Sequence, residues 1–380
     1  MRRPPFILAI PLLLIAVILV GCGGNASPAT SSTTPTPTTP TSPSPPSGGS
    51  GGSSGASPSA QYVYVSGILS DNVWAYRADT NTGALTLVSG SPFSPSSNTT
   101  AHMLCDKWCG ATNRWLTADP LGKFLFEDAV LAGGGALFSF TVDPATGALT
   151  QDDAIAGFTG FLQQIDPQGR FLVRDLGGPN QTTLMNVIAI DRSTGHLTQA
   201  PGSPYTIPTS GSSSTSTYGP AVSANHVYDD VSERNGGHSS IYGFNVGANL
   251  TLTSAPLSPY DSGNLSSFIT MHPSGKRVYA ASVTFVNTVG VAQFQQYVVN
   301  ADGSLTKTGN PVVTNSTGGG FLMFTPDGKF ALIGDAATPP SPGVSNGGGI
   351  SVYAVDQNTG ALTKVAFHPE LGGQLAFDAT

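Results

Sequence analysis

Short apolar runs alternate with polar residues along most of the chain from residue 61 onward. Val73–Tyr76, Ala136–Phe140 and Ile350–Tyr353 have a period of two and contain aromatic side chains, a pattern typical of β-strands. No long segment has the 3.6-residue period of an amphipathic helix. The pattern therefore predicts an all-β fold.

A polar turn motif follows these runs and recurs at intervals of about 50 residues, which indicates a repeat architecture. Its Thr-Gly pair predicts a tight turn, because glycine adopts positive φ at little cost, and the Leu-Thr after it begins a new strand. We expect each copy to join two antiparallel strands. The copies are Asp79–Leu87, Asp143–Gln151, Asp191–Gln199, Asn300–Lys307 and Asp356–Lys364, with a weaker one at Val246–Ser254.

A second turn, with proline and glycine at fixed positions, lies upstream in most repeats. Each repeat is thus predicted to contain four antiparallel strands, here called A to D, as in the blades of a β-propeller. The repeat that includes Tyr218–Val231 lacks this turn. The turn is present at Ala118–Phe124, Ile165–Phe171, Met271–Arg277 and Phe324–Phe330.

The two ends of the repeat region complement each other. Tyr62–Val65 matches a strand B with no strand A before it, and Gln374–Asp378 matches a strand A with nothing after it. We therefore predict a propeller of six blades in residues 61–380. The C-terminal strand is expected to complete the first blade and close the ring, which removes open sheet edges.

The first repeat, Tyr62–Phe93, resembles a repeat of the lactonase-type β-propeller family, which is related to bacterial 6-phosphogluconolactonase. Its last residues, Gly90–Phe93, return in similar form as Gly202–Tyr205. The resemblance implies the propeller fold and hydrolysis of a sugar-type lactone. The family usually has seven blades, so a seven-bladed ring with one degenerate blade is the alternative to six.

The N-terminal segment Met1–Gly21 has a basic start and a short apolar run, Phe6–Val20, which predicts a signal peptide. Leu19–Cys22 resembles the bacterial lipobox. This implies cleavage before Cys22, acylation of its thiol and anchoring to membrane lipid in the bacterial cell envelope, with the outer membrane or cell surface favoured. An ordinary signal peptide or a membrane anchor is the alternative.

Residues 22–60 contain no charged side chain and are rich in Pro, Ser, Thr and Gly, a composition that predicts a disordered linker after the acylated cysteine. Cleavage of the signal peptide would leave 13 of the 15 basic residues against 22 acidic ones, a net charge of −9. This acidic balance argues against a nucleic-acid partner.

Cys105 and Cys109 form an even pair in a domain that is predicted to be exported, and we expect a disulfide between them. A metal site that also includes His102 is an alternative, but no fourth ligand is evident. Free thiols are the remaining alternative. No cofactor and no metal are expected.

Charged residues, which make up 10% of the chain, gather after the predicted strands B of three consecutive repeats, where we expect loops around the mouth of the central channel. Lactone hydrolysis needs a base that activates water and a group that holds the oxyanion. The candidates for the base are Glu127, Asp175 and His238, and those for the oxyanion partner are Arg174 and Arg234. The other charges in this group are Asp128, Asp229, Asp230 and Glu233.

Two functions remain open at this point. One is hydrolysis of a sugar-type or other lactone outside the cytoplasm, as the family resemblance implies. The other is a non-catalytic surface propeller that binds a glycan, peptide or partner protein, which the absence of Gly-x-Ser-x-Gly, His-Glu-x-x-His and other catalytic motifs favours. Under either one, substitution of Arg174 or Glu127 is expected to impair function with little loss of folding.

Overall fold

The computed structural model describes residues 61–380 except for several segments. These are 68–71, 80–83, 95–112, 132–133, 157–159, 178–182, 209–214, 218, 234–237, 265–267, 287–288, 318–321, 336–348 and 369–380. The chain divides into the units Met1–Ser59 and Ala60–Thr380, and the described residues belong to the second. The predicted signal peptide, the linker, the Cys105/Cys109 pair and the closing strand Gln374–Asp378 therefore lie outside the described residues.

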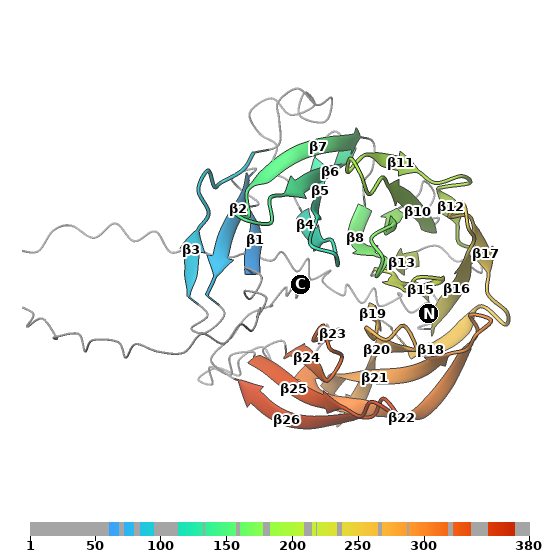
Figure 1. Cartoon of the computed structure of the whole chain (residues 1–380). Coiled ribbons are helices and arrows are strands. Elements are labelled where there is room, and N and C mark those ends of the chain that lie inside the picture. The colour runs from blue at the N-terminus through green and yellow to red at the C-terminus, as the bar shows by residue number, and fades with distance from the viewer. Residues whose placement is uncertain are drawn as a thin grey trace, which may run out of the picture. The chain divides into compact units, whose positions relative to one another are not determined.

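Six antiparallel sheets follow one another along the chain and form a six-bladed β-propeller (Figure 1), which confirms the predicted all-β fold and the count of six. The strands of blades 1 to 3 are β1 (Gln61–Gly67), β2 (Asn72–Ala78) and β3 (Leu85–Leu87); β4 (Asn113–Ala118), β5 (Phe124–Leu131), β6 (Gly134–Val142) and β7 (Leu149–Ala156); and β8 (Gly160–Ile165), β9 (Phe171–Gly177), β10 (Thr183–Ile190), β11 (Leu197–Gln199) and β12 (Tyr205–Thr206).

The strands of blades 4 to 6 are β13 (Thr215–Thr217), β14 (Ala221–Val222), β15 (His226–Glu233), β16 (His238–Val246), β17 (Leu252–Ser254) and β18 (Tyr260–Asn264); β19 (Phe268–Met271), β20 (Arg277–Val286), β21 (Val289–Val299) and β22 (Leu305–Thr317); and β23 (Leu322–Phe324), β24 (Phe330–Asp335), β25 (Gly349–Val355) and β26 (Leu362–His368). Strand B is β1, β5, β9, β15, β20 and β24 in blades 1 to 6. Blade 4 is the irregular one, because β14 extends its strand A and β18 its strand D. Among the described residues no helix has the length and apolar character needed to span a membrane.

The two predicted turn motifs are capped by their own side chains. In the A–B turn of blade 2 the Asp119 carboxylate accepts hydrogen bonds from the N–H groups of Leu121 and Lys123, at 3.2 and 3.1 Å. In the C–D turn of the same blade, Asp143 Oδ1 accepts from the N–H of Ala145, at 2.8 Å. Because the caps are local in sequence, the turns could be predicted from sequence alone.

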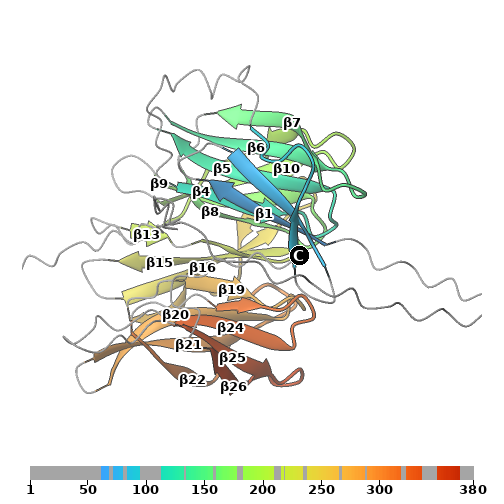
Figure 2. The ribbon, with the colours of Figure 1, turned by 90° about the vertical axis from the view of Figure 1, so that its left-hand side faces the viewer.

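The apolar core is divided among the interfaces between blades. One cluster joins Phe126 and Leu137 of blade 2 to Leu172 and Ile188 of blade 3. Side chains along strand B alternate between the two faces of the sheet, so successive residues pack against the preceding and the following blade. In the side view the strands of blades 4 to 6 lie nearly along one axis, and their arrows point both ways because neighbouring strands are antiparallel (Figure 2).

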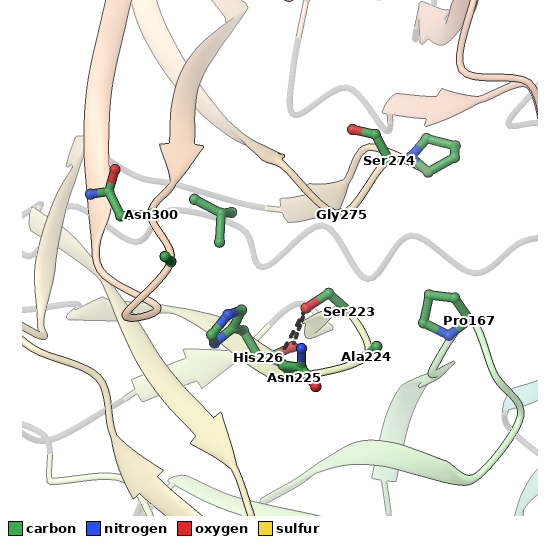
Figure 3. A pocket seen from close by; sticks show the side chains of 11 residues that line it. Pro167, Ser223, Ala224, Asn225, His226, Ser274, Gly275 and Asn300 are labelled. Carbon is green, nitrogen blue, oxygen red and sulfur yellow. Dashed lines mark hydrogen bonds between the residues drawn. The ribbon is translucent and has the colours of Figure 1, made fainter.

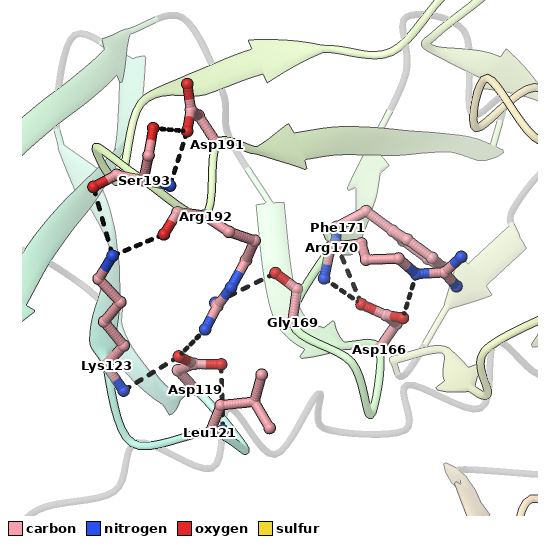
Figure 4. A network of polar contacts seen from close by, with 10 residues as sticks. All are labelled: Asp119, Leu121, Lys123, Asp166, Gly169, Arg170, Phe171, Asp191, Arg192 and Ser193. Carbon is pink, nitrogen blue, oxygen red and sulfur yellow. Dashed lines mark hydrogen bonds and ion pairs between the residues drawn. The ribbon is translucent and has the colours of Figure 1, made fainter.

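Polar contacts between turns join blades 2, 3 and 4 at the end of the ring where strands B begin (Figure 4). The Arg192 guanidinium of blade 3 lies 2.7 Å from the buried Asp119 carboxylate of blade 2. The Lys123 ammonium donates to the carbonyl of Arg192 at 2.6 Å. Arg170 bridges its own turn to blade 4, because it pairs with Asp166 at 2.9 Å and donates to the carbonyl of Ala224. We call the face formed by the A–B and C–D turns the hairpin face.

A tyrosine hydroxyl joins blades at three other interfaces. Tyr64 of blade 1 donates to the carbonyl of Gly147, Tyr228 of blade 4 to that of Gly303, and Tyr279 of blade 5 to that of Gly360, at 3.0, 2.8 and 2.7 Å. Each acceptor belongs to the C–D turn of the next blade. Gly360 has a φ of 77°, and a Cβ atom there would lie 2.4 Å from Arg277, so this turn requires glycine.

Candidate functional site

The charged residues that the sequence places after strands B lie inside these strands. Glu127 and Asp128 belong to β5, Arg174 and Asp175 to β9, and Asp229 and Asp230 to β15. All six side chains are at most 2% exposed. The prediction that Glu127, Arg174 and Asp175 lie on loops at the channel mouth is therefore wrong. The strands continue past the apolar run because the charged residues are paired with both neighbouring strands, as Asp128 is with Trp115 and Leu137.

These residues occupy equivalent positions. Strand B begins at Phe124, Phe171 and His226 in blades 2, 3 and 4, and in each blade its first carbonyl accepts a hydrogen bond that closes the A–B turn. Counted from there, the charged pair always stands at the fourth and fifth residues. The same two positions hold Ala280 and Ala281 in blade 5, and Ile333 and Gly334 in blade 6.

The fifth residue of one blade meets the fourth residue of the next blade. Between blades 2 and 3, the carboxylate of Asp128 forms an ion pair with the guanidinium of Arg174, and both side chains are fully buried. Burial raises the pKa of Asp128 to about 6, although the charge and the hydrogen bond of Arg174 lower it. The pair is enclosed by protein on both sides.

Between blades 3 and 4, two acidic side chains meet, Asp175 and Asp229. Burial raises the pKa of Asp175 to about 7, and the hydrogen bond from the N–H of Gly219 and the neighbouring Asp229 side chain lower it. Burial and the charge of Asp175 raise the pKa of Asp229 well above its usual value. Burial thus favours the protonated form of both carboxyl groups, and the charge of Asp175 adds to this effect on Asp229.

Between blades 4 and 5, the fourth residue of blade 5 is Ala280, so no ion pair can form at these two positions. Asp230 accepts a hydrogen bond from the hydroxyl of Ser262 at 2.9 Å, and Ala280 of blade 5 packs in an apolar cluster with Tyr228 and Ile241. Several buried polar atoms of the three interfaces have no hydrogen-bond partner among the described residues. They are Oδ1 of Asp128, Oδ1 of Asp175, both carboxyl oxygens of Asp229, Oε1 of Gln163 and Nδ2 of Asn186.

Arg174 and Asp175 are consecutive in β9 and so lie on opposite faces of the sheet of blade 3. Arg174 faces blade 2, where it pairs with Asp128, and Asp175 faces blade 4, where it meets Asp229. The structure therefore separates the base and the cation that the sequence paired. No single carbon atom of a ligand can touch both inside these interfaces.

The two remaining sequence candidates do not join this buried cluster. The side chain of His238, at the first position of β16, is 69% exposed and lies 3.8 Å from Asp261. Arg234 lies outside the described residues. Sequence reasoning also missed Asp229 as the partner of Asp175. Alignment of the strands B by their turns is the signal that could have identified it. In the described part of the chain, no group of three His, Cys, Asp or Glu side chains could hold a metal ion.

No family model and no curated protein matches the sequence. Solved structures match the fold. A candidate 6-phosphogluconolactonase from Bacteroides uniformis has a TM-score of 0.55 and 16% identity, over 82% of this chain and 83% of that one. A functionally unknown protein from Desulfotomaculum acetoxidans has a TM-score of 0.53 and 13% identity, over 82% of this chain and 83% of that one. At these identities the likeness shows the propeller fold alone.

Proposed function

We propose that this protein is a non-catalytic propeller that binds a neutral glycan at the cell envelope. One observation carries the proposal. Arg174 and Asp175, the cation and the base predicted on blade 3, stand on opposite faces of that blade, and both are buried in interfaces that the neighbouring blades close, where Arg174 is already held by Asp128. The cluster therefore serves the spacing of blades 2 to 4, and the outer surface of the propeller serves recognition.

The sequence supports a role outside the cytoplasm. The lipobox-like Leu19–Cys22 would supply an acylated cysteine, and the uncharged linker up to residue 60 would hold the propeller away from the lipid. An extended linker of this length reaches on the order of 100 Å at ~3 Å per residue. A tethered propeller of this kind meets glycans and proteins of the envelope rather than cytosolic metabolites.

Two assays on the full-length chain test this function. The first follows acid release from glucono-δ-lactone and γ-butyrolactone at constant pH, and we expect no rate above that of buffer. The second measures binding to an array of neutral glycans, and we expect binding to at least one of them. Turnover above buffer, or no binding across the array, overturns the proposal.

Lactone hydrolysis is the second candidate. The pKa shifts of the Asp175–Asp229 pair favour it, and it requires the interface between blades 3 and 4 to open and admit a lactone. A pKa of about 7 suits a general base at neutral pH. Asp175 would take a proton from water as the water oxygen attacks the carbonyl carbon, and Asp229 would give its proton to the ring oxygen as the C–O bond breaks. The product is one hydroxy acid, and the proton of the pair then lies on Asp175 and no longer on Asp229.

A substitution distinguishes this candidate. Asp229→Asn keeps a hydrogen-bond donor beside Asp175 but removes the acid, so hydrolysis by the pair should fall about 100-fold or more in a variant that a thermal melt shows to be folded at the assay pH. Asp327→Asn is the control, because Asp327 lies in the A–B turn of blade 6, far along the chain from the pair, where it caps Lys329. Equal rates in the two variants would assign any turnover to another site.

A further inference from the structure

A hollow of about 330 Å³ lies on the hairpin face among the turns of blades 3, 4 and 5 (Figure 3). Its floor is the A–B turn of blade 4, Ser223–His226. Its walls include Pro167 of blade 3, Ser274 of blade 5 and Asn300 from the C–D turn of blade 5. Small-molecule sites span roughly 300 to 1,000 Å³, so this hollow suits a ligand of one ring.

The hollow exists because one turn is shorter than its neighbours. The A–B turns of blades 3 and 5 run from Asp166 to Phe171 and from His272 to Arg277. The corresponding turn of blade 4 closes from Ser223 to His226, two residues sooner, because it lacks the Pro-x-Gly segment. The shorter turn of blade 4, between the two longer turns of blades 3 and 5, leaves this space open. The one irregular repeat in the sequence thus forms the hollow.

The polar groups in the lining have fixed roles. Asn245 donates its amide to the carbonyl of Asp302 at 3.1 Å, so its Oδ1 accepts from Nδ1 of His226 at 2.9 Å. His226 therefore holds its ring in a set orientation, with Nε2 outside that network. The amide nitrogen of Asn300 donates to both Ser304 and Thr306 at 2.9 Å, which leaves its Oδ1 as an acceptor.

No Asp, Glu, Lys or Arg side chain lines the hollow. Arg170, on the same face, uses its guanidinium on Asp166 and on the carbonyl of Ala224. The lining combines neutral hydrogen-bonding groups, such as the exposed Asn225, with the flat apolar surfaces of Pro167 and Pro273. A pyranose ring has the matching surface, because it carries hydroxyl groups around its edge and C–H groups on its faces.

We propose that this hollow binds a single neutral sugar ring, the terminal unit of the glycan named above. The inference rests on the proposed function and gives it a place. It is independent of the Asp175–Asp229 pair, which stands three to five residues further along strands B and inside an interface.

The test measures saturation-transfer difference NMR spectra of the full-length chain in a sugar-free detergent. The probes are methyl α-D-glucopyranoside, methyl α-D-mannopyranoside and N-acetylglucosamine, none of which is a lactone. We expect transfer to the ring protons of at least one. Ala301→Trp should fill the hollow and weaken binding at least tenfold, and Asn225→Ala should weaken it about fivefold through one lost hydrogen bond.

Two variants control for general effects. Ala145→Trp and Asn358→Ala place the same changes in exposed C–D turns of blades 2 and 6, and they should leave the affinity unchanged. If Ala301→Trp binds glycans as well as the wild type does, the hollow is not the binding site, and the proposed function still stands. No transfer to any of the three sugars also overturns the hollow. No binding across the glycan array overturns both.

Discussion

The interfaces of blades 2 to 4 and the interface between blades 5 and 6 use the same backbone positions in opposite ways. Between blades 5 and 6, Ala281 and Ile333 pack in one apolar cluster. Between blades 2 and 3, the equivalent positions hold the buried ion pair Asp128–Arg174. The propeller itself therefore does not require ionisable groups at these positions. A buried pair is often no more stable than apolar packing of the same volume.

A second difference accompanies the first. The third residue of strand B is a tyrosine that bonds the next blade in blades 4 and 5, whereas blades 2 and 3 have Phe126 and Val173 there. The interfaces without the tyrosine hydroxyl are the ones with the ionisable pairs. Each described interface from blade 2 to blade 6 thus contains at least one pair of polar groups in addition to its apolar packing, which helps to fix how the blades align.

Removal of the cation should have the largest effect. Arg174→Ala leaves the Asp128 carboxylate buried without its partner and should lower the free energy of unfolding by about 3 to 5 kcal/mol. This corrects the expectation that Arg174 could be replaced with little loss of folding. Urea unfolding of the wild type, Arg174→Ala and the double variant Arg174→Met/Asp128→Leu measures it. The double variant should regain most of the lost free energy of unfolding. If it is as unstable as Arg174→Ala, apolar residues cannot replace the ion pair at these positions.

The acid pair should make stability depend on pH. The pKa of Asp175 is raised to about 7 and that of Asp229 is raised well above its usual value, so between pH 4 and 7 the folded state holds protons that the unfolded chain has released. The free energy of unfolding should therefore fall as pH rises through this range, by up to about 1.4 kcal/mol per pH unit for each proton.

Urea unfolding at pH 5, 6, 7 and 8 measures this slope, and Asp229→Asn should flatten it because one proton no longer titrates. Several turn aspartates act in the opposite sense at lower pH. Asp143, for example, has a pKa lowered by hydrogen bonds from Ala145 and Thr146, so its contribution is lost as pH falls below about 4. An equal slope in the wild type and in Asp229→Asn between pH 5 and 8 would show that the pair does not share a proton.

Removal of a tyrosine hydroxyl should have the smallest effect. Tyr279→Phe deletes the bond to the carbonyl of Gly360 and keeps the ring packed, so the free energy of unfolding should fall by about 1 kcal/mol. Lys276→Ala, at an exposed position just before strand B of the same blade, is the matched control and should change nothing measurable. If the two variants unfold alike, the hydroxyl does not hold blades 5 and 6 together.

The sequence by itself determined the strands, the turns and the count of six blades. Each of these depends on residues close together in the chain: the alternating run Ala136–Phe140, the cap of Asp143 on its own turn, and the Pro-Leu-Gly segment that closes the turn from Asp119 to Phe124. Local hydrogen bonds and period-two burial leave their mark in the sequence because nothing distant is needed to produce them.

Only the tertiary structure decided what the charged residues do. Arg174 and Asp175 look like one catalytic pair in the sequence, but the pleat of β9 turns them to opposite faces and the neighbouring blades bury both. Their partners, Asp128 and Asp229, lie 46 and 54 positions away. The hollow beside His226 likewise needs turns from three blades that meet only in the ring. Contacts between blades join distant residues, so no local pattern records them.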